Sequence, residues 1–276
     1  MSQPPRIFDT PLISQHLARR TELGNFVTDL VLADLEDRLA ALIRDFPRAA
    51  IIGPDIDKLP SFGQAASARF AFERYAAFAG EDDVPALTGD DYNLIVSILH
   101  LQAVNDVPGY LARLRARLAP DGLLLVATLG GDTLTELREA FLAADAMVYG
   151  GASARIAPML QVRDGGALLQ RAGLALPVAD VETHIVRYPT PLALMAEIKA
   201  LGAANPLLDR SRRMASPALL AAAAQAYAER DSDPDGRIRA TLEIVWLSGW
   251  APHDSQQKPL KPGSATTRLG DVLGQV

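Results

Sequence analysis

A short segment after an apolar run carries the residues with the clearest potential for chemistry. Residues 49–52 are all apolar and predict a strand, and Gly53 follows where many α/β proteins begin a ligand-binding loop. The chain continues with Pro54 and Asp55, and Asp57 comes two residues later, so the further glycines of such a loop are absent. We interpret the segment as either a cofactor site or the remains of one.

Other catalytic chemistries have no matching pattern. The chain has no cysteine, which excludes disulfides, thiolate metal ligands and cysteine nucleophiles. It has neither a GxSxG nucleophile turn nor a GKS or GKT phosphate loop. The histidines are not spaced as metal-binding pairs, so we interpret them as packed or surface residues and predict no metal site; they are His16, His100, His184 and His253.

Composition bounds the class of protein. With 276 residues, of which 49% are hydrophobic, the chain is long enough to bury a substantial core in one elaborated α/β domain. Its net charge of -6 repels polyanions, so nucleic acid is a poor partner. No apolar run reaches the roughly 20 residues of a membrane span, and the N-terminus has no apolar core of signal-peptide length. Together with the absence of cysteine, these features predict a soluble cytoplasmic protein.

The elements that would position the loop alternate along the first half of the chain. Apolar residues at helical spacing predict an amphipathic helix, and nearly continuous apolar runs predict strands buried on both faces. The expected ranges are a helix over 26–42, strands over 49–53 and 94–98, a helix over 108–118 and a strand over 123–129, whereas residues 68–72 are either a short strand or part of a helix. The last strand-helix-strand unit predicts a parallel pair with a right-handed crossover.

The second half continues the alternation. Thr133 and Glu136 have the spacing of a capping box, which predicts a helix that begins there and runs to about residue 146. Gly173 predicts the end of another helix, before an extended segment over 181–188. Two more helices are expected in "PLALMAEIKALGA" and "ALLAAAAQAYAERD", and "RATLEIVWLSGWAP" predicts a closing strand. The polar tail that follows is expected to pack on the domain with its first half.

Several blocks of this sequence resemble one known family. They include "VNDVPGYLARLRARLAPDGLLLVATLGGDTLTELREAF", "VRDGGALLQRAGLALPVADVETHIVRYPTPLALM" and "GWAPHDSQQKPLKPGSA", and the likeness covers most of the chain. They resemble the class I S-adenosylmethionine methyltransferase-like family that includes the mitochondrial assembly factor of respiratory complex I and its bacterial relatives. A more distant resemblance is to the malonyl carrier-protein methyltransferase of biotin synthesis.

The resemblance implies a fold and a division of the chain. The expected fold is α/β, with a doubly wound, seven-stranded, mostly parallel, Rossmann-like sheet whose last strand is antiparallel. A cofactor site is implied at the carboxyl ends of the first strands. We expect one methyltransferase-like domain over residues 1–276, with an N-terminal helical extension over 1–47, an α/β core over 48–250 and a tail over 251–276.

The family's first cofactor motif has an acid and three spaced glycines at the end of the first strand. Here Ile51 stands at the acid, Gly53 matches the first glycine and Asp55 stands at the second. A side chain in place of a glycine restricts the backbone of the loop, and Pro54 has no N–H to donate to a ligand. Asp55 and Asp57 would place negative charge beside the cofactor's own carboxylate, and two such charges about 4 Å apart cost roughly 1 kcal/mol in water and about 4 kcal/mol near a protein surface. Weakened binding is therefore implied, unless an aspartate pairs with the cofactor's ammonium or sulfonium.

Other positions of the resemblance supply the remaining candidates. Glu73, after "RFAF", matches the acid that binds ribose in the family, or is an ordinary surface glutamate. Glu81 falls at the adenine-binding acid if one gap is allowed. Gln102 and Ala103 replace the family's histidine and tryptophan, whereas the following "VND" is kept.

Two side chains are candidates for substrate contact. Asp132 lies in the "GGDT" turn after a strand, at the edge where such sheets bind ligands, and is either a substrate residue or a helix-capping carboxylate. Arg155, in "GGASARIAP", either binds an acidic group or forms a loop salt bridge.

Two functions remain open at this point. One is a methyltransferase-like protein with weakened or lost S-adenosylmethionine binding, which acts on or docks to a protein partner such as a respiratory complex I subunit. The alternative is an active S-adenosylmethionine-dependent methyltransferase, or an arginine hydroxylase as the resemblance implies, with a divergent cofactor loop. The altered loop favours the first, and the sequence identifies no catalytic residue.

Overall fold

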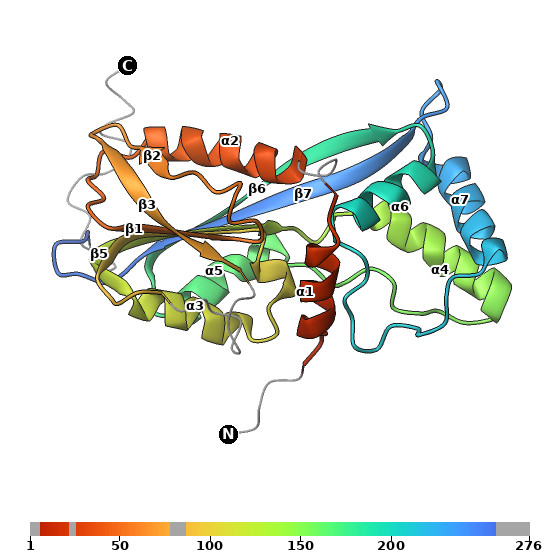
Figure 1. The fold of residues 1–276 in the computed structure, drawn as a ribbon, viewed down its shortest axis with the longest axis horizontal. Helices are drawn as coiled ribbons and strands as arrows, with labels where there is room; N and C mark the ends of the chain where they lie inside the picture. Colours follow the sequence, from red (N-terminus) through yellow and green to blue (C-terminus); the bar gives the residue numbers. More distant parts are fainter. Residues whose placement is uncertain (1–5, 22–25, 78–86, 258–276) are drawn as a thin grey trace, which may run out of the picture.

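The computed structural model describes residues 6–21, 26–77 and 87–257. Within them, seven strands form one sheet in the order β2-β3-β1-β4-β5-β7-β6 (Figure 1). The strands are β1 Ala49–Gly53, β2 Phe62–Gln64, β3 Arg69–Ala76, β4 Tyr92–Ile98, β5 Leu118–Leu129, β6 Ala175–Tyr188 and β7 Ile238–Trp250. The helices are α1 Thr10–Ala18, α2 Phe26–Ala40, η1 Leu101–Ala103, α3 Val107–Ala116, α4 Thr135–Tyr149, α5 Val162–Arg171, α6 Pro191–Ala200 and α7 Pro217–Asp231.

The centre of the sheet is parallel and its flanks are antiparallel. Strands β3, β1, β4 and β5 run in one direction, whereas β7 pairs antiparallel with both β5 and β6, and β2 pairs antiparallel with β3. Every residue of β1 is buried, as expected for a parallel strand with helices on both faces. The predicted seven-stranded, Rossmann-like sheet with an antiparallel last strand is confirmed, in a mixed form.

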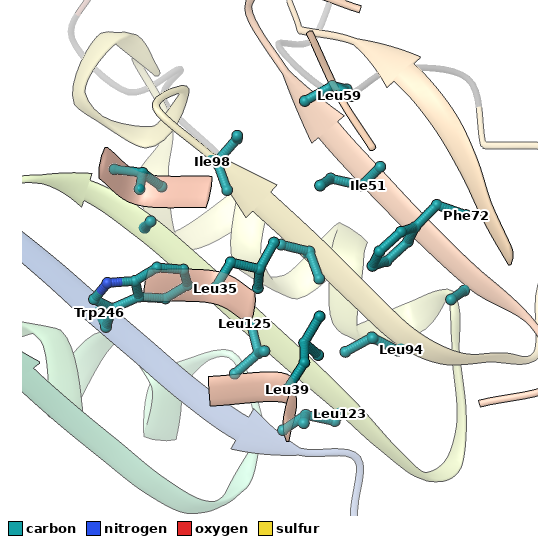
Figure 2. Packing of buried hydrophobic residues seen from close by; sticks show 14 of the residues in the cluster. Leu35, Leu39, Ile51, Leu59, Phe72, Leu94, Ile98, Leu123, Leu125 and Trp246 are labelled. Carbon is teal, nitrogen blue, oxygen red and sulfur yellow. The ribbon is translucent and has the colours of Figure 1, made fainter. Parts of the chain in front are cut away.

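Two hydrophobic layers hold helices against the sheet. On one face, α2 places Leu35 and Leu39 against Ile51, Leu94 and Trp246 (Figures 1 and 2). On the other face, α3 and α5 pack onto the same strands, with their buried side chains in a second cluster. Full burial of one such leucine contributes about 1.5–3 kcal/mol, so the two layers fix the position of the strand ends.

A third helical group extends the domain beyond the sheet. Helices α4, α6 and α7 lie together at one end of the molecule, next to the ends of β6 and β7 (Figure 1). Leu137, Leu194, Tyr227 and Ile238 form the centre of their buried cluster. Helix α1 stands between this group and the sheet (Figure 1).

The predicted capping box at the start of α4 is wrong. The helix begins at Thr135, and Leu134 before it has a left-handed backbone with φ of 56°. Thr133 Oγ1 donates to the Glu243 carbonyl at 3.1 Å and accepts from the Glu243 N–H at 3.0 Å. The Glu136 carboxylate accepts from the Thr241 N–H at 3.1 Å. Both side chains therefore bond to β7, which fixes this helix to the sheet.

Candidate functional site

The loop after β1 is not followed by a helix. Residues 54–61, all of which the structure describes, form turns and extended backbone, with the Lys58 N–H donating to the Asp55 carbonyl at 3.1 Å. A helix at this point would direct its free N–H groups and the positive end of its dipole toward a ligand. The segment between β1 and β2 offers neither.

The side chain of Leu59 occupies the space beside the end of β1. Leu59 is buried and belongs to the same cluster as Ile51 and Ile98 (Figure 2). A Cβ built on Gly53 would lie 2.7 Å from Leu59 Cδ2 and 3.1 Å from Ile98 Cγ1. The room that Gly53 leaves is thus filled by the chain's own side chains.

Asp55 is held by a cation from the N-terminal region. Its Oδ2 lies 3.4 Å from Arg20 Nη2, and about a fifth of each side chain is exposed (21% and 23%). The ion pair joins the segment after α1 to the loop after β1. The negative charge of Asp55 is therefore compensated within the chain, whereas Asp57 in the same loop is exposed.

Glu73 is engaged in a hydrogen-bond cluster. It lies opposite Ala50 in the sheet, before the end of β3, and its carboxylate accepts from Arg48 Nε at 3.1 Å, the Tyr75 hydroxyl at 2.7 Å and the Tyr92 hydroxyl at 2.6 Å. Burial raises the pKa of Glu73, but these hydrogen bonds outweigh it and lower the pKa below its usual value. Glu73 does not line the cavity described next.

A cavity of about 420 Å³ lies at the carboxyl ends of β4 and β5. Residues at the ends of these strands form one wall, such as Leu99 just after β4 and Leu129 at the end of β5. Side chains of α1, α4 and α6 form the others, including Leu17, Phe141 and Ile198. Because ligands of open α/β sheets bind at the carboxyl ends of the strands, this cavity is the candidate functional site.

Several residues named from the sequence line the cavity, among them Pro54 of the loop after β1, Gln102 and Arg155. Gln102 follows β4, and its Oε1 accepts from Thr128 Oγ1 at 3.1 Å. Arg155 donates to both carboxylate oxygens of the buried Asp145, at 2.7 and 2.6 Å. The hydrogen bond to Asp145 raises the pKa of Arg155. Arg155 was interpreted either as a residue that binds an acidic group or as part of a salt bridge, and in the structure it forms a salt bridge.

Asp132 and Glu81 are not brought into the cavity wall. Asp132 is exposed, and its backbone N–H donates to Glu243 Oε2 at 3.1 Å, while its neighbour Thr133 does line the cavity. Glu81 lies outside the described residues. The structure thus places the "GGDT" turn at the cavity with its threonine, not its aspartate, turned inward.

Helix α1 contributes to the cavity wall, which was not predicted from the sequence. Its Ile13, His16 and Leu17 line the cavity, as does Arg20 just after the helix. The spacing of three and four residues within α1 is that of one helix face, and this signal could have identified it. The kept "VND" explains how α1 is held, because Asn105 Oδ1 accepts from the backbone N–H groups just before this helix, at 2.7 and 2.8 Å.

These features define a class of protein. A parallel β3-β1-β4-β5 centre, an antiparallel β7 between β5 and β6, and a cavity at the strand ends are the arrangement of class I methyltransferases. A family model described as "Methyltransferase domain" matches residues 22–202, and the chain belongs to this family.

Several named proteins are similar to this chain over most of its length. The human protein named "Arginine-hydroxylase NDUFAF5, mitochondrial" is 32% identical over 269 residues, covering 91% of this chain and 77% of that protein. The Dictyostelium discoideum protein of the same name is 34% identical over 194 residues, covering 70% of this chain but 44% of its own length. A "Malonyl-[acyl-carrier protein] O-methyltransferase" from Xylella fastidiosa is 29% identical over 260 residues, covering 91% of this chain and 85% of that protein.

Two features are absent from the described residues. None of their helices combines the length and the apolar character needed to cross a membrane. No group of three or more metal-binding side chains occurs among them either.

Proposed function

We propose that this chain is a methyltransferase-like protein with weakened or lost S-adenosylmethionine binding, which acts on or docks to a protein partner. The observation that carries the proposal is the position of Leu59, which packs against Gly53 where the family's cofactor motif needs an open backbone cradle. The absence of a helix over residues 54–61 supports it further, because no row of free N–H groups faces that point.

The groups that would complement the cofactor are engaged elsewhere. Asp55, a candidate partner for its ammonium or sulfonium, is paired with Arg20. Glu73, the candidate for the ribose hydroxyls, accepts from Arg48 and two tyrosines. Binding in the family's usual manner would require these interactions to break, and the residues present therefore do not fit the cofactor.

A protein partner is supported by charge and by the relatives. The net charge of -6 favours association with a basic segment. Two of the relatives are named arginine hydroxylases, and arginine is a basic residue. A subunit of respiratory complex I with an exposed arginine segment is the partner that we propose.

An active enzyme with a divergent loop is the second candidate. It would be an S-adenosylmethionine-dependent methyltransferase or an arginine hydroxylase. The cavity at the ends of β4 and β5 favours it, because a site at this edge is kept and Pro54 places the cavity next to the loop after β1.

Calorimetric titration with S-adenosylmethionine tests the cofactor part. We expect no heat, or a Kd weaker than about 100 µM, which corresponds to about -5.5 kcal/mol. The double variant Pro54→Gly/Asp55→Gly should bind more tightly if the loop limits affinity, and Lys58→Gly, at an exposed residue of the same loop outside the glycine positions of the motif, is the matched control. Micromolar binding by the unaltered chain would overturn the proposal.

Cross-linking of the tagged chain inside its host cell tests the partner part. We expect mass spectrometry to recover a complex I subunit joined to this chain through a basic segment. Recovery of other proteins with no complex I subunit would contradict the proposed partner.

A further inference from the structure

The wall of the cavity is predominantly apolar and comes from widely separated parts of the chain. Leu17, Phe141, Leu194 and Leu242 belong to four different helices and strands, yet all of them face the same space. The volume of about 420 Å³ lies in the range of small-molecule sites, which is about 300–1,000 Å³. The cavity is therefore large enough for a molecule of moderate size.

The electrostatic character of the wall is neutral. No aspartate or glutamate lines the cavity in the described part of the chain, and the arginines in its wall are Arg20 and Arg155. Arg20 is paired with Asp55 and Arg155 with Asp145. Burial and a hydrogen bond to Glu197 raise the pKa of Tyr188, so this lining phenol also stays uncharged. A charged ligand would lose hydration here without gaining a counter-charge.

Two lining side chains can still bind a polar atom. Gln102 uses its Oε1 to accept from Thr128, which leaves its amide Nε2 to donate. His16 Nδ1 is buried and has no hydrogen-bond partner among the described residues. Buried polar atoms are usually satisfied, so an unpaired one in a cavity wall points to a ligand atom as its partner.

We infer that this cavity binds an uncharged, predominantly apolar small molecule with one hydrogen-bond acceptor, such as an acyl or prenyl chain that ends in a carbonyl group. The inference deepens the proposed function, on which it rests, because it gives the methyltransferase-like site a ligand other than the family's cofactor. Specificity comes from a neutral wall that disfavours either sign of charge and from donors that meet the carbonyl oxygen.

Three probes of equal chain length test the preference for an uncharged head group. They are 2-decanone, decanoate and decylammonium, titrated into the full chain and followed by calorimetry. We expect 2-decanone to bind at least about tenfold more tightly than either ion, since a buried unpaired charge is disfavoured more strongly than a carbonyl. No binding of 2-decanone, or tighter binding of an ion, would overturn the inference. Esters of a fatty acid and of a prenyl alcohol then distinguish the two sources of such a chain.

Two variants locate the binding. Ala103→Trp reduces the cavity, and we expect it to weaken 2-decanone binding at least about tenfold, because room for one or two methylene groups is worth that much. Ala221→Trp, on the exposed side of α7 and outside the cavity wall, is the matched control. Unchanged binding by a folded Ala103→Trp variant would show that the probe binds elsewhere.

Gln102→Glu keeps the shape of the side chain and its acceptor for Thr128 but adds a negative charge. We expect it to reverse the order of the probes, so that decylammonium binds more tightly than 2-decanone. An unchanged order would contradict the inference even if Ala103→Trp failed to fold. Failure of 2-decanone to bind would leave the cofactor proposal standing, whereas micromolar S-adenosylmethionine binding would overturn that proposal separately.

Discussion

At the scale of single residues, a substitution at Gly53 tests whether the end of β1 is an open cofactor loop or part of a packed core. Gly53→Ala should lower the free energy of unfolding by about 1–3 kcal/mol, because its Cβ would meet Leu59 and Ile98. Urea denaturation measures the change. The double variant Gly53→Ala/Leu59→Ala should lose less stability than the sum of the losses of the two single variants, because the smaller side chain at position 59 makes room for the new Cβ.

Gly166→Ala is the matched control for this prediction. It lies inside α5, where a built Cβ meets nothing within 4 Å. The same substitution should there raise the free energy of unfolding by about 0.5–1 kcal/mol, as expected for glycine to alanine within a helix. Equal effects at both glycines would mean that the space beside β1 is open, and it would remove the main support for lost cofactor binding.

Arg155 tests whether its ion pair is structural. Arg155→Met should lower the free energy of unfolding by about 3–5 kcal/mol, because it leaves the fully buried Asp145 carboxylate without a partner. Arg230→Met is the control, since Arg230 pairs with Glu139 at the surface, where such a pair is worth about 0–1 kcal/mol. If the two variants were equally stable, Arg155 would be free to serve a ligand instead.

Glu73 gives the protein a defined acid dependence. Its pKa in the folded state is below the ordinary value of 4.5, so its stabilising effect is complete above about that pH and is lost as the pH falls through the lower folded pKa. Glu73→Gln should therefore flatten the curve of unfolding free energy against pH in the acid range below about pH 4.5. A variant curve parallel to that of the unaltered chain would show that the cluster with Arg48, Tyr75 and Tyr92 does not form.

At the scale of elements, β6 contains a position where the backbone favours glycine. Leu176 lies in an irregular part of the strand, is 49% exposed and has φ of 50°. Leu176→Gly should be more stable than Leu176→Ala by about 1 kcal/mol, because left-handed backbone disfavours any Cβ by about that amount. At the exposed Val178, where φ is not positive, alanine should instead be better than glycine by about 0.5–1 kcal/mol. Thermal unfolding of the four variants checks whether glycine is the more stable choice at position 176 and alanine at position 178.

The elements that were predicted correctly from the sequence are those whose burial leaves a clear apolar pattern. The runs around 49–53 and 94–98 became β1 and β4, because side chains buried on both faces leave a continuous apolar pattern. Thr133 and Glu136 misled the prediction, since their bonds go to residues of β7 more than a hundred positions away, which no local pattern reveals. The short β2 was also missed, as its residues are largely exposed and only its pairing with β3 defines it.

The candidate site was predicted only in part for the same reason. Gln102 and Arg155 do line the cavity, because they follow elements whose ends the family resemblance fixes. The role of Leu59 could not be predicted, since it depends on a loop returning over Gly53 in the absence of a helix. The neutral wall was also hidden, because it arises from helices α1, α4 and α6 that are distant from one another in sequence.

At the scale of the whole molecule, stability is expected to fall from the centre of the sheet to its β2 edge. Strand β4 is paired on both sides and lies between two hydrophobic layers, whereas β2 pairs only with β3 and is largely exposed. Hydrogen exchange should therefore open β4 amides only with global unfolding, and β2 amides with a free energy nearer to zero. Leu59, in the loop before β2, is buried in the first layer, so amides of residues 57–59 should be better protected than those of β2. Exchange as fast at residues 57–59 as in β2 would mean that Leu59 leaves the end of β1 often enough to admit a ligand, and the proposed loss of cofactor binding there would be contradicted.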